Sequence, residues 1–372
     1  MTEKVTLDRV IAFLRIFLMV ACCWPISPNM TKFQRLLRRA LRYFCCANSI
    51  IFIIAAVWTI CHQNNYMLLI KVGCELSAVL QVILQLVLFA MQDKRFEFLV
   101  SEMEDYYQRA QKFEKEIFQY YVDKCKLFYG IIFCWLIMTA LSMMATPLFT
   151  PQTFPCQTEY PFDIHYQPLK TIILVHHLFT IYQSMTQVSA NSFPALFLWF
   201  VAARFHILSV RFRTMTNMKE LIKCTQEHNI LLRYAKEVSL AIRYVALLVV
   251  TFSIGAVIFG YLTFISRESW LVKATYFLIT FGAFIELFMF AWPADYVMSM
   301  STDIASAVYD SLWYNDDLVM QKLLTNVIIR SQRPVTVSVP CALPSLCLSY
   351  YASYLSTVFS YMAAVRLLME EN

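Results

Sequence analysis

The chain has 372 residues, of which 59% are hydrophobic and 15% are charged, and its formal net charge is +6. Soluble domains carry about 25% charged residues, so this composition excludes an ordinary water-soluble protein. The five glycines form no phosphate-binding loop, and no zinc-type histidine or cysteine spacing occurs. We therefore predict no enzyme, no cofactor, no metal site and no nucleic-acid partner.

A short apolar run comes first in the chain. Residues 11–24 read IAFLRIFLMVACCW, include Arg15, and are followed by no small-residue cleavage site. We predict a short helix that lies at the membrane or dips into it, rather than a signal peptide.

Seven longer apolar stretches follow, and each is long enough to cross about 30 Å of hydrocarbon as a helix. Backbone groups in lipid must bond within their own segment, so the sequence predicts an all-α integral membrane protein with seven transmembrane helices in a single domain, residues 1–372. The fourth stretch is unusually long, and we expect it to tilt or to bend at Pro194. The stretches are 43–62, 67–91, 127–149, 171–203, 243–265, 274–294 and 345–368.

Lys and Arg residues gather in alternate connections between these helices. Because positive residues stay on the cytoplasmic side, we predict a cytoplasmic N-terminus and an extracellular C-terminus. The domain then divides into a cytoplasmic segment (1–42), six helices (43–294), a cytoplasmic connection (295–344), and a last helix with an outer tail (345–372). The segments 1–42, 91–126, 204–243 and 295–344 hold 26 of the 31 basic residues.

Two of the inner segments, 93–126 and 204–243, carry dense charge at helical spacing. We predict that they are cytoplasmic extensions of membrane helices. Whether they form a hub for subunit contacts or are only solvated helix ends stays open.

Three motifs near the C-terminus point to a family. Residues 302–313 read TDIASAVYDSLW, residues 328–334 read IIRSQRP, and the last helix contains Ser360-Tyr361. In this order and at this distance from the C-terminus, they resemble insect odorant receptors. The last helix has no Gln-Phe ending of the gustatory receptor type, and the chain has no enlarged region between the fourth and fifth helices, as the obligate odorant co-receptor does.

The resemblance implies an odour-tuning subunit of a ligand-gated, non-selective cation channel in the plasma membrane of sensory-neuron dendrites. It also implies a hetero-oligomer, a tetramer with the co-receptor, around a pore lined by the last helices. The alternative is a gustatory-type channel subunit. A transporter would need an internal repeat or glycine-broken helices, which the sequence lacks, and a metabotropic receptor would need the opposite topology.

Mildly polar residues recur at helical spacing on the third and fourth predicted helices, for example Thr139 and Ser142 on one and His176 and Thr180 on the other. Either the two stripes bond to each other, or they border a small, mostly apolar pocket for a neutral volatile ligand. The expected pocket residues are Leu76, Val79, Leu80, Thr139, Ser142, Met143, Thr146, His176, Thr180, Met185, Tyr261, Tyr276 and Phe277.

The last predicted helix has a stripe of small and hydroxyl-bearing side chains. Such a stripe serves either close helix packing or the lining of a pore, and the family resemblance favours the pore. Ala364 and Leu368 would then form its apolar constriction, and the stripe consists of Ser353, Thr357, Ser360, Ala364 and Leu368. The following Glu370 and Glu371 either form a ring of carboxylates at the outer mouth or belong to a solvated tail.

Three further positions are singled out by their chemistry. Lys71 and Glu75 have the spacing of an ion pair on one helix. Glu286 lies in the middle of the sixth helix, where an ionisable group is costly, and the sequence names no partner for it. Cys156 lies in the long outer loop as either a disulfide partner or a free thiol.

Overall fold

The regular structure of the chain is helical, as expected. A computed structural model describes residues 5–20, 23–25, 31–164, 166–311 and 317–370. In these ranges the only strand-type pairing is an isolated bridge between Val339 and Leu343. The all-α prediction is therefore confirmed. The helices are α1 (Leu7–Val20), α2 (Lys32–His62), α3 (Tyr66–Met91), α4 (Asp93–Arg109), α5 (Lys112–Phe149), α6 (Leu169–Ala190), α7 (Ser192–Thr214), α8 (Met218–Ile265), α9 (Trp270–Tyr309), α10 (Leu318–Ser331) and α11 (Leu348–Glu370).

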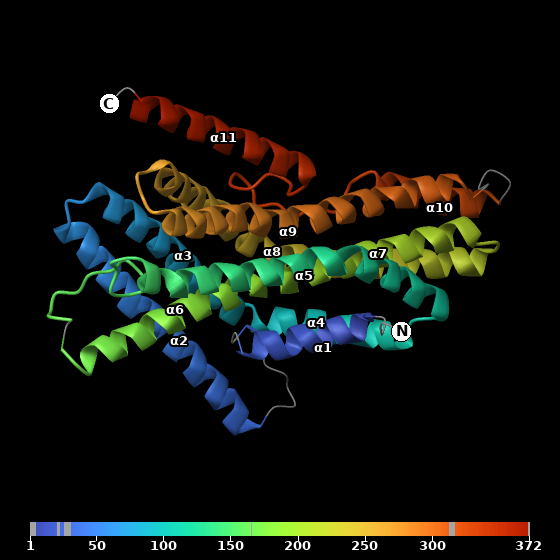
Figure 1. Cartoon of the computed structure of the whole chain (residues 1–372). Coiled ribbons are helices and arrows are strands. Elements are labelled where there is room, and N and C mark those ends of the chain that lie inside the picture. The colour runs from blue at the N-terminus through green and yellow to red at the C-terminus, as the bar shows by residue number, and fades with distance from the viewer. Residues whose placement is uncertain (1–4, 21–22, 26–30, 165, 312–316, 371–372) are drawn as a thin grey trace.

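Helix α7 forms the centre of the bundle. All residues from 192 to 205 are buried, which is typical of a helix that is apolar on every side. It packs most extensively on α9 and also on α8 and α5, and Figure 1 shows these helices running along the length of the molecule. In the same view α2 and α6 diverge at one end, whereas α11 lies along an outer edge.

Six of the seven expected membrane spans appear as helices that are long and apolar enough to cross a bilayer within the described residues. The fourth of these spans comprises α6 and α7 together. The seventh expected span is α11, whose 23 residues reach about 35 Å. Helix α11 is not among the six helices that meet the length and hydropathy criterion within the described residues.

The fourth span breaks at Asn191, between α6 and α7, rather than at Pro194 itself. Pro194 occupies the third position of α7, and a proline ring clashes with the carbonyl group four residues earlier, here that of Ala190. The sequence predicted a bend at Pro194. The helix is instead interrupted about one turn earlier, at Asn191, where the proline ring disturbs the preceding turn.

The short N-terminal helix α1 is present, beginning four residues before the expected run. Its buried face carries Leu7, Ile11, Leu14 and Leu18, which join the main core. Figure 1 shows it beside α4, and Arg15 forms an ion pair with Glu104 of that helix. Helix α1 is thus part of the folded bundle.

Candidate ligand cavity and pore face

A largely apolar cavity of about 120 Å³ lies between α3, α5, α6, α8 and α9. Its few polar groups include the side chains of Gln81, Thr139, Ser184 and Glu286. An apolar enclosure with a few placed polar groups is the usual form of a small-molecule site. This cavity is therefore the candidate ligand site of the chain.

Five of the thirteen residues expected in the pocket line this cavity, namely Val79, Thr139, Met143, Thr180 and Met185. Met143, Thr146 and Tyr276 border a smaller neighbouring cavity of about 20 Å³. Ser142 hydrogen-bonds through its hydroxyl to the Thr275 hydroxyl at 2.6 Å. Six expected residues border neither cavity: Leu76, Leu80, Ser142, His176, Tyr261 and Phe277. The contact of any of these residues with a ligand stays a prediction.

The sequence predicted Tyr276 and Phe277 of α9 as pocket residues, but not the residues of this helix that form a wall of the cavity. Gly282, Ala283 and Glu286 line the cavity from this helix, and Phe52 of α2 and Cys156 of the loop after α5 complete it. A signal was available, because Gly282 and Glu286 are four residues apart and so share one helix face.

The buried carboxylate of Glu286 has two amide partners. Gln81 donates to its Oε1 through Nε2 at 2.6 Å, and Asn191 donates to the same oxygen through Nδ2 at 2.5 Å. Gln85 in turn donates to the side-chain oxygen of Asn191. Because Asn191 is the residue at the break between α6 and α7, this cluster joins that break to the cavity wall and to α3.

The loop after α5 closes one end of the cavity. Glu75 accepts a hydrogen bond from the backbone N–H of Gln157 at 3.0 Å, whereas Lys71 pairs with Glu268 at 2.7 Å. The expected pair between Lys71 and Glu75 is therefore replaced by two contacts to different segments. Lys71 is buried and reaches the loop that joins α8 to α9, a partner that spacing along one helix does not indicate.

In the loop between α5 and α6, Cys156 is a buried free thiol that lines the cavity. Burial raises the pKa of this thiol well above its usual value, so the group stays protonated and unreactive. This placement favours the free-thiol interpretation over a disulfide.

The polar stripes of the third and fourth predicted helices do not bond to each other. On α5, Trp135 donates to the carbonyl of Leu278 and Ser142 contacts Thr275, so this stripe faces α9. On α6, Gln183 donates to the carbonyl of Cys45 and Thr180 accepts from Asn48, so that stripe faces α2. The two stripes therefore bond to different partner helices, and residues of both α5 and α6 line the cavity.

The stripe on α11 faces outward. The side chains of Ser353, Thr357, Ser360 and Ala364 are exposed, and the three hydroxyls donate to carbonyl groups four residues earlier in the same helix at 2.9–3.1 Å. The opposite face is buried, and Tyr354 donates to Ser253 of α8 at 2.9 Å. The side chains of Leu368 and Glu370, and all of Glu371, lie outside the described part of the chain.

Comparison with known protein families identifies the family of the chain. Residues 65–359 match the family described as 7tm Odorant receptor, which is more than half of the chain. The chain belongs to this family. Together with the six apolar helices, membership makes the receptor a multi-pass protein of the plasma membrane.

Curated relatives of the receptor are similar over part of their length. The odorant receptor Or2 of Anopheles gambiae is 26% identical over 156 residues, which are 41% of this chain and 40% of that protein. Odorant receptor 22c of Drosophila melanogaster is 33% identical over 92 residues, which are 25% of this chain and 22% of that protein. The matches thus span less than half the length of these relatives.

The fold of the receptor is similar to that of a solved olfactory receptor. The structure of OR5 from Machilis hrabei in complex with eugenol superposes with a TM-score of 0.85 at 16% identity, over 98% of this chain and 99% of that one. OR5 without eugenol superposes with a TM-score of 0.84 over 96% of the receptor and 98% of OR5, also at 16% identity.

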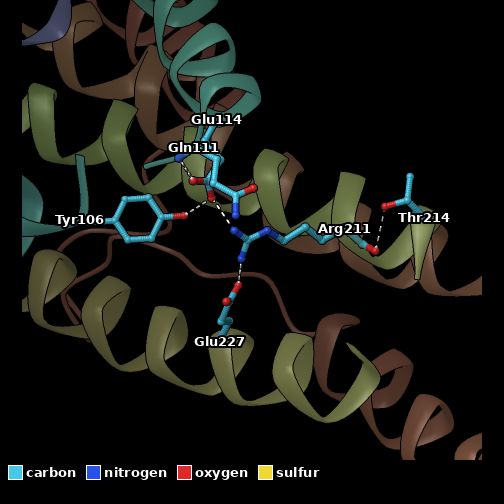
Figure 2. A network of polar contacts seen from close by, with 6 residues as sticks. All are labelled: Tyr106, Gln111, Glu114, Arg211, Thr214 and Glu227. Carbon is cyan, nitrogen blue, oxygen red and sulfur yellow. Dashed lines mark hydrogen bonds and ion pairs between the residues drawn. The ribbon is translucent and has the colours of Figure 1, made fainter. Parts of the chain in front are cut away.

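Away from the cavity, the charged helix extensions of the receptor meet in a polar network, shown in Figure 2. Arg211 of α7 donates to Glu114 of α5 at 2.6 Å through one guanidinium nitrogen and pairs with Glu227 of α8 through another. Tyr106 of α4 also donates to Glu114, and burial raises the pKa of its phenol to about 12, so it remains a neutral donor. The extensions are therefore folded against one another, which confirms that they are helices.

We expect Arg211→Lys to lower the thermal midpoint of the purified receptor by a few degrees. An ammonium group cannot reproduce the planar fork that joins two carboxylates, so one contact to Glu114 or Glu227 is lost at a cost of about 1–2 kcal/mol. The matched control is Arg213→Lys, because Arg213 is more exposed and its pairs contribute little. Equal midpoints for the two variants would contradict the assigned role of Arg211.

Proposed function

We propose that the chain is the odour-tuning subunit of a ligand-gated, non-selective cation channel, and not an enzyme. The observation that carries the proposal is a largely apolar cavity between the helices of a chain of the odorant receptor family. Burial of hydrocarbon supplies the affinity in such a cavity, and a few polar groups orient the ligand. The ligand class is therefore a small, neutral, volatile molecule.

The channel assembles as a tetramer with an odorant co-receptor, with the N-terminus in the cytoplasm and the C-terminus outside, in sensory-neuron dendrites. The excess of basic residues in alternate connections supports this orientation. The exposed hydroxyl stripe of α11 supports the pore, because these side chains are exposed and their hydroxyls bond to carbonyl groups of α11 itself. In this proposal the chain is a single domain, and residues 345–372 form its pore helix and outer tail.

Gating follows from differential binding. A ligand that binds more tightly to the open arrangement shifts the population toward it. The buried cluster of Glu286 and Asn191 supports a route for this shift, because it joins the cavity wall to the break between α6 and α7. In our proposal the pore widens at Ala364 and Leu368 when the ligand binds.

The experiment that tests the function is co-expression with an odorant co-receptor in cells, with current recorded against a panel of neutral volatile compounds. We expect an inward cation current for part of the panel, and we expect it to persist in excised patches without GTP. Surface expression without any evoked current would exclude the channel proposal. A current that requires GTP would instead favour a metabotropic receptor, and uptake of the compound without current would favour a transporter.

At the outer mouth, we expect Glu370→Gln combined with Glu371→Gln to lower the single-channel cation conductance to roughly half. A ring of carboxylates raises the local cation concentration, and this effect is greatest at low ionic strength. The measurement is single-channel current at low and high salt. Unchanged conductance at low salt would assign these residues to a solvated tail.

A further inference from the structure

A second and larger cavity, of about 520 Å³, lies between α1, α5 and α7. It shares no lining residue with the candidate ligand cavity. Its wall is apolar and aromatic, with Phe13 and Leu14 from α1, Phe133 from α5, and Leu196 and Trp199 from α7. A cavity of this size accommodates a ligand of a few dozen heavy atoms, and an apolar wall favours hydrocarbon over water.

The mouth of this cavity opens on the apolar outer surface of the bundle. Phe13 and Gly130 line the cavity and are exposed, and the neighbouring Leu127 and Ile131 of α5 are 71% and 53% exposed. A Cβ atom added at Gly130 would meet no atom within 4 Å, so the chain is open at this point. Since exposed apolar residues of a membrane protein face lipid, hydrocarbon from the bilayer has direct access.

Both charged side chains in the wall are cations, Arg9 and Lys126. Lys126 also donates to Asp123 at 2.5 Å, but this is an exposed pair, and such pairs open at little cost. Two cations beside an apolar cavity complement an anionic head group attached to a hydrocarbon chain.

We propose that this cavity binds one anionic phospholipid from the bilayer, with an acyl chain between α1, α5 and α7 and its head group at Arg9 and Lys126. The site is separate from the odorant cavity and does not depend on the proposed function. It reaches Ser192, the residue after Asn191, so the bound chain contacts the start of α7.

The test is photolabelling of the full-length receptor in nanodiscs with phospholipids that carry a diazirine near the end of the acyl chain. One probe has a phosphatidylglycerol head group and the other a phosphatidylcholine head group. We expect adducts on residues 196–203, because Leu196, Trp199, Phe200 and Ala203 are at most 8% exposed and an acyl chain reaches them only through the cavity. General lipid contact would label exposed α5 residues such as Ile137 instead.

The head group decides the second part of the proposal. We expect the phosphatidylglycerol probe to label residues 196–203 about tenfold more than the phosphatidylcholine probe, because each nearby cation contributes several-fold to binding of an anionic lipid. Arg9→Gln combined with Lys126→Gln should make the two probes equal. Equal labelling by both probes in the unchanged receptor would overturn the assignment of an anionic lipid.

Two variants at the mouth complete the test. Gly130→Trp places a large side chain where the structure is open, so labelling of residues 196–203 should fall to background while labelling near Ile137 persists. The smaller Gly130→Leu should reduce labelling partially, and Ile137→Trp, on the same helix but exposed, should leave it unchanged. Absence of adducts on residues 196–203 in the unchanged receptor, or full labelling in a folded Gly130→Trp variant, would overturn the proposal.

Discussion

Ala78→Phe is expected to raise the odorant concentration for half-maximal current by about tenfold or more, or to abolish the response. Ala78 lines the candidate ligand cavity from α3, so a phenyl ring at this position takes up space within only about 120 Å³. A ligand that loses the burial of one comparable group loses about 1.5–3 kcal/mol of binding free energy, which is at least a tenfold change in affinity. The measurement is a dose–response curve in cells that also express the co-receptor.

The matched control for this variant is Ala90→Phe. Ala90 lies on the same helix, is exposed, and is not part of the cavity wall. The substitution is chemically identical, so it reports the general effect of a new phenyl ring on α3. A normal dose–response curve for Ala78→Phe, with normal surface expression, would exclude this cavity as the odorant site.

Glu286→Leu is expected to destabilise the receptor by about 2–6 kcal/mol. The substitution leaves the buried amide donors of Gln81 and Asn191 without their acceptor, and each unpaired buried group costs about 1–3 kcal/mol. The thermal midpoint and the yield of folded protein in detergent should both fall.

Glu286→Gln is the paired variant. The amide oxygen of glutamine can accept the same two hydrogen bonds, so we expect stability close to that of the unchanged receptor. If both variants were equally unstable, the charge of Glu286 rather than its acceptor role would be essential. Full stability of Glu286→Leu would show that the cluster contributes little to folding.

Properties that depend on local sequence were predictable. The apolar spans follow from composition and length, and the helical extensions follow from charge at helical spacing. The position of the break in the fourth span was predicted only approximately, because Pro194 indicates an interruption nearby but not the residue at which α6 ends.

Properties that depend on packing between distant helices were not predictable. The partners of Glu286 come from α3 and from the break at Asn191, and Lys71 pairs with Glu268 rather than with its neighbour on the same helix. Likewise, residues such as Phe277 satisfied the expected chemistry of a pocket wall but lie on the outer face of α9, where the side chain is 49% exposed. Periodicity gives the face of each helix, but not which faces meet.

The central claim is that α11 lines the pore. The most direct test is modification of Thr357→Cys by a positively charged thiol reagent applied from outside during odorant stimulation. Thr357 lies in the middle of the exposed stripe on α11, so the account predicts that the reagent reaches it and blocks the current, faster with odorant than without. The unchanged receptor, which has exposed cysteines elsewhere, provides the baseline. An odorant-evoked current through Thr357→Cys that the reagent leaves unaffected would contradict a pore lined by α11.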